Sequence, residues 1–212
     1  MKIARKILSI ILTFALLLGT VSALVGSASA QEVTGESIYW YFDKSTGTLT
    51  ISDTAKEGYR EFTAGAQLST TVYTIPWNSG KWYCEGLKHV NIVGAPRPAS
   101  TKLWFANAKE LDSITNLDKL DTSCVVSMES MFNSCSILET VDLSKFDTSN
   151  VKNFHGMFAY CKKIGTIDVS SFDTSSGEDF SAMFAWCEIL ETLDVSNFII
   201  NQPSVDFEGI FS

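Results

Sequence analysis

A repeat of 26 residues is the feature of this sequence that most constrains its fold. Each copy opens with Met-Phe or a close variant of it, at Trp104, Met131, Met157, Met183 and Ile210. The three central copies are spaced by 26 residues, and residues 131–156 match residues 157–182 at 11 of 26 positions without a gap. A unit this short cannot bury its apolar face alone. Successive copies must therefore stack as the coils of a solenoid.

The pattern within one copy predicts both a strand and a helix. Val141 and Leu143 alternate with polar neighbours, which is typical of a strand with one buried face. Residues 147–150 (Asp-Thr-Ser-Asn) favour a turn or a helix N-cap. Apolar residues then recur at a spacing that suits a helix of about two turns, at Val151, Phe154, Met157 and Phe158. We therefore expect an α/β solenoid of the leucine-rich-repeat type, with one short strand and one short helix in each coil of about 26 residues.

The segment before the repeats predicts a small β-rich cap. Residues 38–42 and 48–52 have the composition of two strands, and Asp43 to Gly47 suits a hairpin loop. Residues 72–75 and 90–93 are further strand candidates, and the proline-containing stretch at 95–98 indicates the passage into the coils. We expect a cap over residues 31–98 and a solenoid of about four coils over 99–212. The last coil begins without a capping segment, which favours a fragment of a longer surface protein; the alternative is an open end closed by self-association.

The first 30 residues have the pattern of a secretory signal peptide. Lys2, Arg5 and Lys6 precede an apolar run from Ile7 to Leu18, and the segment closes with Ala-Ser-Ala at 28–30. The alternative is a membrane anchor, but the run is shorter than the roughly 20 residues needed to span a bilayer. We expect cleavage after Ala30 and a secreted or cell-surface chain, with no membrane insertion of the mature protein.

Charge and motif content argue against several classes of function. The net charge is −8, and removal of the three cations of the leader makes it −11. An acidic surface disfavours nucleic acid and anionic lipid as partners. The chain has two histidines and lacks a nucleophile elbow, a phosphate loop and a metal-binding His pair. We expect no enzymatic activity, no catalytic residue, no metal and no cofactor, although a pair of glycosidase-type carboxylates among the many aspartates stays open.

Three cysteines occupy one repeat position and should form a column. Stacked coils lie about 5 Å apart, and the position falls among apolar residues, so buried thiols that act as small hydrophobes are favoured. A disulfide between neighbours and a metal site are the alternatives. The expected core of the repeat is Phe132, Cys135, Phe158, Cys161, Phe184 and Cys187. Cys84 and Cys124 lie outside this position, and the repeat does not explain them.

Aspartates also recur with the repeat, at Asp142, Asp168 and Asp194 and again at Asp147 and Asp173. Like charges about 5 Å apart repel unless backbone donors or a cation compensate them. A calcium site is one interpretation, but the spacing of a calcium loop and the glycine-rich nonapeptide of calcium solenoids are missing. Aspartates that cap turns are the favoured interpretation.

The candidate binding residues are Ser134, Tyr160 and Trp186, which share the position just before the cysteine. This position should lie at the edge of a coil, so Tyr160 and Trp186 should be neighbours on the surface. Adjacent exposed aromatic rings suit a sugar ring or a protein hot spot. The alternative is that both rings merely shield one side of the solenoid.

The repeat unit M-F-x-x-C-x-x-[LI]-x-T-[VIL]-D-[VL]-S-x-F-D-T-S resembles the BspA-like leucine-rich repeat of bacterial surface proteins, over residues 104–212. Residues 40–51 resemble the entry segment that often precedes such repeats. The resemblance implies a secreted or cell-surface adhesion module that binds host or microbial surface proteins or glycans, and it implies no catalytic residues. The alternatives are a structural stalk of a larger surface protein and a fragment of a carbohydrate-active enzyme.

Overall fold

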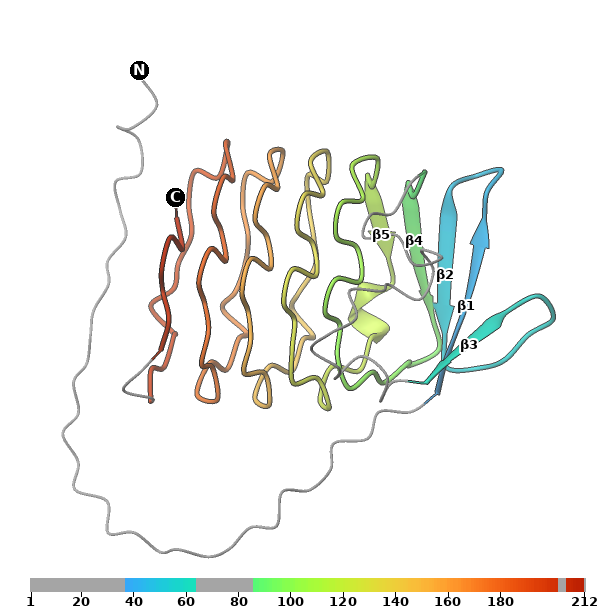
Figure 1. Cartoon of the computed structure of the whole chain (residues 1–212), viewed down its shortest axis with the longest axis horizontal. Coiled ribbons are helices and arrows are strands. Elements are labelled where there is room, and N and C mark those ends of the chain that lie inside the picture. The colour runs from blue at the N-terminus through green and yellow to red at the C-terminus, as the bar shows by residue number, and fades with distance from the viewer. Residues whose placement is uncertain (1–36, 64–85, 202–204, 212) are drawn as a thin grey trace, which may run out of the picture.

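The computed structural model describes residues 37–63, 86–201 and 205–211. A five-stranded sheet lies at one end of the molecule, and the coils extend from it in a single row toward the C-terminus (Figure 1). The strands are β1 (Ser37–Asp43), β2 (Thr48–Ser52), β3 (Arg60–Thr63), β4 (His89–Val93) and β5 (Ser113–Thr115). Their order in the sheet is β3-β1-β2-β4-β5.

The predicted hairpin is present as β1 and β2, which pair antiparallel with Trp40 opposite Ile51. Alternate side chains of the two strands are buried, as a sheet with one packed face requires. Gly47 closes the loop with a φ of 71°, and a Cβ atom there would lie 2.6 Å from the carbonyl oxygen of Gly86. Only glycine fits this turn without displacing the neighbouring backbone.

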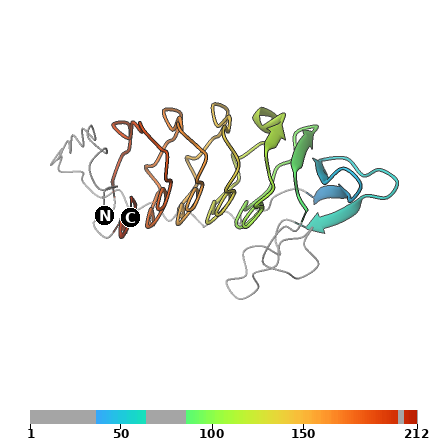
Figure 2. The same ribbon diagram turned by 90° about the horizontal axis from the view of Figure 1, so that it is seen from above.

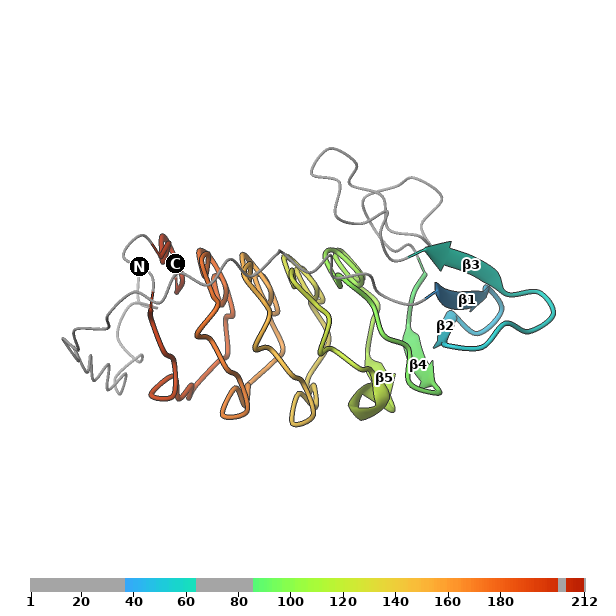
Figure 3. The ribbon, with the colours of Figure 1, turned by 90° about the horizontal axis from the view of Figure 1, so that it is seen from below.

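Strand pairing changes from antiparallel to parallel where the sheet meets the solenoid. β2 pairs parallel with β4, and β4 pairs parallel with β5. The separation between β4 and β5 in sequence is close to one coil, so these two strands are the first rungs of the stack (Figures 2 and 3). Backbone pairing between β2 and β4 therefore joins the cap to the coils within one sheet.

The prediction of a helix in each coil is wrong. Among the described residues there is no α-helix, and the single helical element is a 3₁₀ turn, η3 (Leu117–Lys119). Where a helix was predicted from Val151 to Phe158, the chain makes a bridge and then consecutive turns. The fold is a solenoid built from sheet and turns, and not an α/β solenoid of the leucine-rich-repeat type.

The hydrogen bonds of residues 127–135 show how the turns replace a helix. The N–H groups of residues 128, 130, 132 and 134 donate to the next coil, at Asn153, His155, Met157 and Ala159. The carbonyl groups of residues 127, 129, 131 and 133 accept from the preceding coil. The N–H groups of residues 131, 133 and 135 close local turns three residues back. We call this segment, and its equivalent in each coil, the turn ladder; it satisfies its backbone without the bonds between residues four apart that define an α-helix.

Left-handed backbone at two positions of the ladder, four residues apart, excludes the helix. One position is held by Leu103, Ser130, Gly156, Ala182 and Gly209, and the other by Asn107, Ser134, Tyr160 and Trp186. Left-handed residues cannot belong to a right-handed helix. The apolar residues of the predicted helix are nevertheless all buried, at Val151, Phe154, Met157 and Phe158. The spacing identified the buried side chains and not the backbone that carries them.

The expected strand is present as β5 in the first coil but not in the later ones. Residues 138–143 belong to no strand, and a single parallel bridge joins Thr166 to Thr192 on this side. On the ladder side, bridges join consecutive coils through Ser127, Asn153, Asp179 and Asp206.

The core of the solenoid consists of phenylalanine columns. Phe132 stacks on Phe158 with ring centroids 5.3 Å apart, and Phe158 stacks on Phe184 at 5.9 Å. A second column places Phe180 between Phe154 and Phe207, at 5.0 and 5.3 Å. Burial of the rings in each column requires at least two coils, which is why the units depend on their neighbours.

Some predictions concern residues outside the described ranges. These are the signal peptide at 1–30, the strand at 72–75 and Cys84. Within the described residues, no helix has the length and apolar composition needed to cross a membrane.

Candidate binding face

Four residues at one position of the turn ladder form what we call the outer column: Asn107, Ser134, Tyr160 and Trp186. Their φ angles are between 57° and 61°, so the backbone is left-handed at each of them. The N–H groups of Ser134 and Tyr160 donate to the following coil at 2.7 and 2.8 Å. The backbone at Ser134 and Tyr160 is therefore fixed against the following coil.

The structure brings Tyr160 and Trp186 together on the surface. The two rings are parallel within 5°, and their centroids are 5.9 Å apart. Tyr160 is 43% exposed and Trp186 is 55% exposed. Ser134 lies one coil earlier and is half-buried, and its hydroxyl group donates to Asn133 Oδ1 at 2.8 Å. Ser134 thus borders the ring pair and adds no ring of its own.

Aromatic residues are poor choices for this backbone conformation. A residue other than glycine in the left-handed region costs about 1–2 kcal/mol, and Asn and Asp tolerate it best. The first coil has Asn107 at this position, which fits a purely structural role. Tyr160 and Trp186 combine the unfavourable conformation with exposed rings, so core packing does not account for them.

Charged side chains connect the same coils beside the rings. Lys162 and Glu188 follow Tyr160 and Trp186 by two residues, and their charged groups are 2.6 Å apart. Lys152 and Glu178 form a similar pair at 2.9 Å on the other side of the ladder. All four side chains are more than 45% exposed. Exposed pairs of this kind contribute little stability, and they leave polar groups available at the surface.

A protein family described as "Mycoplasma protein of unknown function, DUF285" matches residues 99–212, which is more than half of the chain. The chain belongs to the DUF285 family. No curated protein and no solved structure matches it. The family description contains no activity, so the chemistry of this DUF285 chain has to be argued from its own residues.

The cysteine column of this DUF285 chain is structural. Cys135, Cys161 and Cys187 are reduced, and each thiol donates to a carbonyl oxygen of the preceding coil at 3.2 Å. Burial raises the pKa of Cys161 well above its ordinary value and raises that of Cys187 to about 11. A raised pKa disfavours the thiolate needed for nucleophilic attack or metal binding. Cys124 is half-buried and also reduced, and nothing in the structure explains it.

The aspartate columns cap turns, as the favoured interpretation predicted. Asp142, Asp168 and Asp194 each accept the backbone N–H of the serine two residues later, at 2.9–3.0 Å. Hydrogen bonds from that serine lower the pKa of each carboxyl group. In the described part of the chain, no group of three or more His, Cys, Asp or Glu residues is arranged to hold a metal ion.

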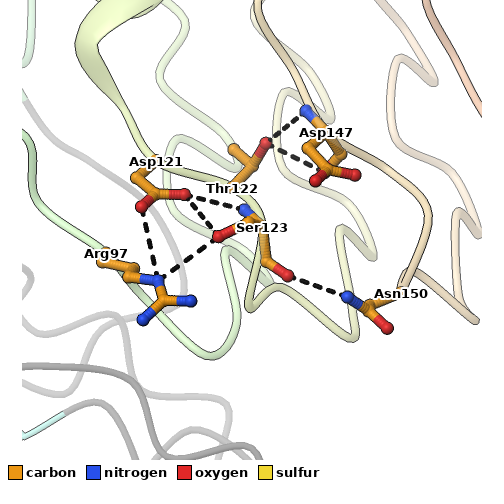
Figure 4. Close-up of polar contacts among 6 residues, drawn as sticks. All are labelled: Arg97, Asp121, Thr122, Ser123, Asp147 and Asn150. Carbon is orange, nitrogen blue, oxygen red and sulfur yellow. Dashed lines mark hydrogen bonds and ion pairs between the residues drawn. The ribbon is translucent and has the colours of Figure 1, made fainter.

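Buried threonines tie the coils together, a role that the sequence analysis missed. Thr122 donates its hydroxyl to the carbonyl oxygen of Asp147 at 2.9 Å and accepts the Asp147 N–H at 2.8 Å (Figure 4). Thr148 donates in the same way to Asp173, and Thr174 makes both bonds with Ile199. The recurring Asp-Thr-Ser sequence was the signal for this role, but the same three residues also suit an ordinary turn.

The corner beside this threonine is also held by side chains. Asp121 accepts hydrogen bonds from the backbone and the hydroxyl of Ser123, and Arg97 reaches both residues at 3.3 Å (Figure 4). Asn150 donates to the carbonyl oxygen of Ser123 at 2.9 Å, from the next coil. These contacts lie within the protein, so this corner serves to fix the coils.

Proposed function

We propose that this DUF285 chain is a non-enzymatic binding module, secreted or attached to a cell surface, that engages surface proteins or glycans through the outer column. The secretory pattern of residues 1–30 supports the location. The observation that carries the proposal is the parallel, exposed pair of Tyr160 and Trp186 on left-handed backbone.

Two physical features of the pair favour binding over mere shielding. Exposed aromatic rings supply large contact areas with few rotatable bonds, which is why such residues dominate hot spots. The ladder needs left-handed backbone at this position, but asparagine would meet that need at a lower cost than tyrosine or tryptophan, so the two exposed rings favour a role beyond the fold. Fixation of the ladder by hydrogen bonds to both neighbouring coils also reduces the entropy lost when a ligand binds.

The test compares the purified chain with a Tyr160→Asn/Trp186→Asn variant on immobilised matrix proteins and glycans. Asparagine is suitable because Asn107 occupies the equivalent position in the first coil, so the fold should persist. The matched control is Tyr41→Thr. Tyr41 is 44% exposed and stacks on Tyr59 at 5.9 Å, but it lies in the sheet.

We expect the parent chain and the Tyr41 variant to bind the same ligand and the double variant to lose at least tenfold in affinity. Circular dichroism checks that all three proteins are folded. Binding that survives the double substitution would exclude the outer column as the site. A folded parent chain that binds nothing on the panel would favour the structural stalk instead.

A further inference from the structure

We propose that the space over Ser134, against the face of Tyr160 that Trp186 does not cover, is a slot for a neutral hexopyranose ring of a glycan. This inference rests on the proposed function and assigns a ligand class to the same surface. It also gives Ser134 a defined role, as the small residue that keeps the slot open.

The spacing of the coils sets the size of the slot. Rings at equivalent positions of consecutive coils have centroids 5.3–5.9 Å apart in the Phe132, Phe158 and Phe184 column and in the Tyr160–Trp186 pair. This distance lies within the range of about 4.5–7 Å at which rings stack. The distance between consecutive coils is therefore also a distance at which two rings can stack. A ligand ring stacked on Tyr160 would lie level with the coil that contains Ser134.

Ser134 leaves this level open. Trp186 stacks on one face of Tyr160, and the tyrosine is still 43% exposed. The residue at the equivalent position on the other side is Ser134, whose side chain ends in one hydroxyl group turned toward Asn133. A hydroxymethyl group is too small to cover a phenol ring. A ligand can thus reach the second face of Tyr160 without moving the backbone.

The hydrogen bonds of the ladder disfavour an extended peptide as the occupant. A peptide that adds to a sheet edge needs free backbone donors on the receptor. The N–H groups of Ser134 and Tyr160 donate to the next coil, and those of Cys135 and Cys161 close local turns. These four donors are therefore occupied, so a peptide strand would find no backbone N–H partner among them.

The side chains around the slot suit a ring with an apolar face and a polar rim. Tyr160 provides the flat surface and, at its edge, a hydroxyl group that can donate to or accept from a sugar hydroxyl group. The charged group of Lys162 reaches Glu188 in the following coil, on the Trp186 side of Tyr160, so this ion pair lies away from the slot. The net charge of −8 disfavours acidic sugars. A neutral hexopyranose has the matching chemistry, with C–H groups on its faces and hydroxyl groups at its edge.

The decisive variant is Ser134→Tyr, which would fill the slot from within the protein. Tyr160 and Trp186 show that this backbone position accepts large aromatic residues, so the variant should fold and extend the ring column. The matched control is Ser134→Ala, which keeps the slot open. The probes are cellohexaose, mannohexaose and laminarihexaose, with binding measured by calorimetry on the full chain.

We expect at least one of these oligosaccharides to bind the parent chain, Ser134→Ala to bind within about threefold of it, and Ser134→Tyr to lose at least tenfold. Saturation-transfer NMR on the parent chain gives an independent readout. Saturation of aromatic protons should reach the C–H protons of one sugar face most strongly.

The outcomes separate this inference from the proposed function. The proposed slot would be wrong if Ser134→Tyr bound the oligosaccharide as tightly as the parent chain does. It would also be wrong if saturation transfer were uniform over the sugar protons. A second outcome is that the parent chain binds a matrix protein, loses this binding in Tyr160→Asn/Trp186→Asn, and binds none of the three oligosaccharides. That result would overturn the assignment of a sugar ligand and keep the proposed binding module. Loss of both kinds of binding in the parent chain would overturn both proposals.

Discussion

In the five-stranded sheet, neighbouring strands pair over runs of three to five residues, and alternate side chains are buried on one face. In the turn ladder, every second N–H reaches the next coil and the others close turns within the coil. Both regions bury continuous apolar columns. The sheet does so with extended backbone that most residues adopt, whereas the ladder needs two left-handed residues in each coil.

The difference indicates where each region is sensitive to substitution. In the sheet, a residue matters mainly through the volume and polarity of its buried side chain. In the coils, backbone conformation and a few buried hydroxyl groups matter as well, because they set the step from one coil to the next. Four substitutions test this contrast, from the largest expected effect to the smallest.

The largest effect should come from Phe158→Ala. The ring is fully buried and stacks on both Phe132 and Phe184, so its removal leaves a cavity that spans three coils. We expect a loss of about 3–5 kcal/mol in the free energy of unfolding, measured by urea denaturation. Leu49→Ala in β2 is the comparison from the sheet, with about 2–5 kcal/mol. Hydrogen exchange should show lost protection at the Ser134 and Tyr160 amides for Phe158→Ala, and unchanged protection there would contradict a core shared between coils.

Thr148→Val should have the next largest effect. The residue is buried, and its hydroxyl donates to the Asp173 carbonyl at 2.9 Å. Valine keeps the shape and leaves the Asp173 carbonyl with one partner fewer, so we expect a loss of about 0.5–1.5 kcal/mol. Thr148→Ser keeps the hydroxyl and should lose less. Thr50→Val in β2 should change stability by under about 0.5 kcal/mol, and an equal effect of the two valine substitutions would break the contrast.

Ala182→Gly should increase stability. Ala182 has a φ of 52°, and glycine holds the same position at Gly156 and Gly209. Glycine removes the strain of left-handed backbone but gains freedom in the unfolded chain, so the net gain should be up to about 1 kcal/mol. Ala159→Gly, at a position without positive φ, should lose about 0.5–1 kcal/mol. Thermal melts of both variants measure the difference, and two changes of the same sign would show that the left-handed position is not strained.

Asp168→Asn should have the smallest effect at neutral pH and a distinct one in acid. The hydrogen bonds from Ser170 lower the pKa of Asp168 below 3.8, so the folded state binds its proton more weakly than the unfolded state. This contribution to stability is complete above the ordinary carboxyl pKa of 3.8 and is lost as the pH falls through the lowered pKa of the folded state. Asparagine can keep the turn, as Asn153 does with His155. Melting temperatures between pH 6 and pH 2.5 should fall less steeply for the variant, and parallel curves would contradict the assignment.

Much of the fold was accessible from the sequence, for reasons that particular residues show. The hairpin of β1 and β2 depends on short-range signals, alternation and Gly47, and it was predicted correctly. The adjacency of Tyr160 and Trp186 follows from a shared repeat position, because stacked coils place equivalent residues side by side. The burial of Phe154 and Phe158 followed from their spacing.

The backbone of the coils was not accessible in the same way. A spacing of three residues between apolar positions suits consecutive turns as well as a helix, and periodicity does not separate the two. A sequence indicates left-handed backbone when glycine or asparagine holds the position. Neither residue stands at Ser134, Tyr160 or Trp186, and the signals from Asn107, Gly156 and Gly209 are scattered over two repeat positions. The role of Thr148 depends on a partner 25 residues away, which local patterns cannot reveal.

The hydrogen bonds of the turn ladder also give the solenoid a direction. In the described coils, fifteen N–H groups of the ladder point from a coil to its successor, from Thr101 to Phe184, and the ladder carbonyls point back. At the start of the ladder the direction is reversed, since the N–H groups of Val126, Lys152 and Glu178 donate to the preceding coil. Every junction between coils thus has the same pattern of donors and acceptors, and this pattern is not symmetric. A coil can be added or removed as a whole copy with matching junctions, but it cannot be inverted. The length of the array can therefore change in steps of one coil.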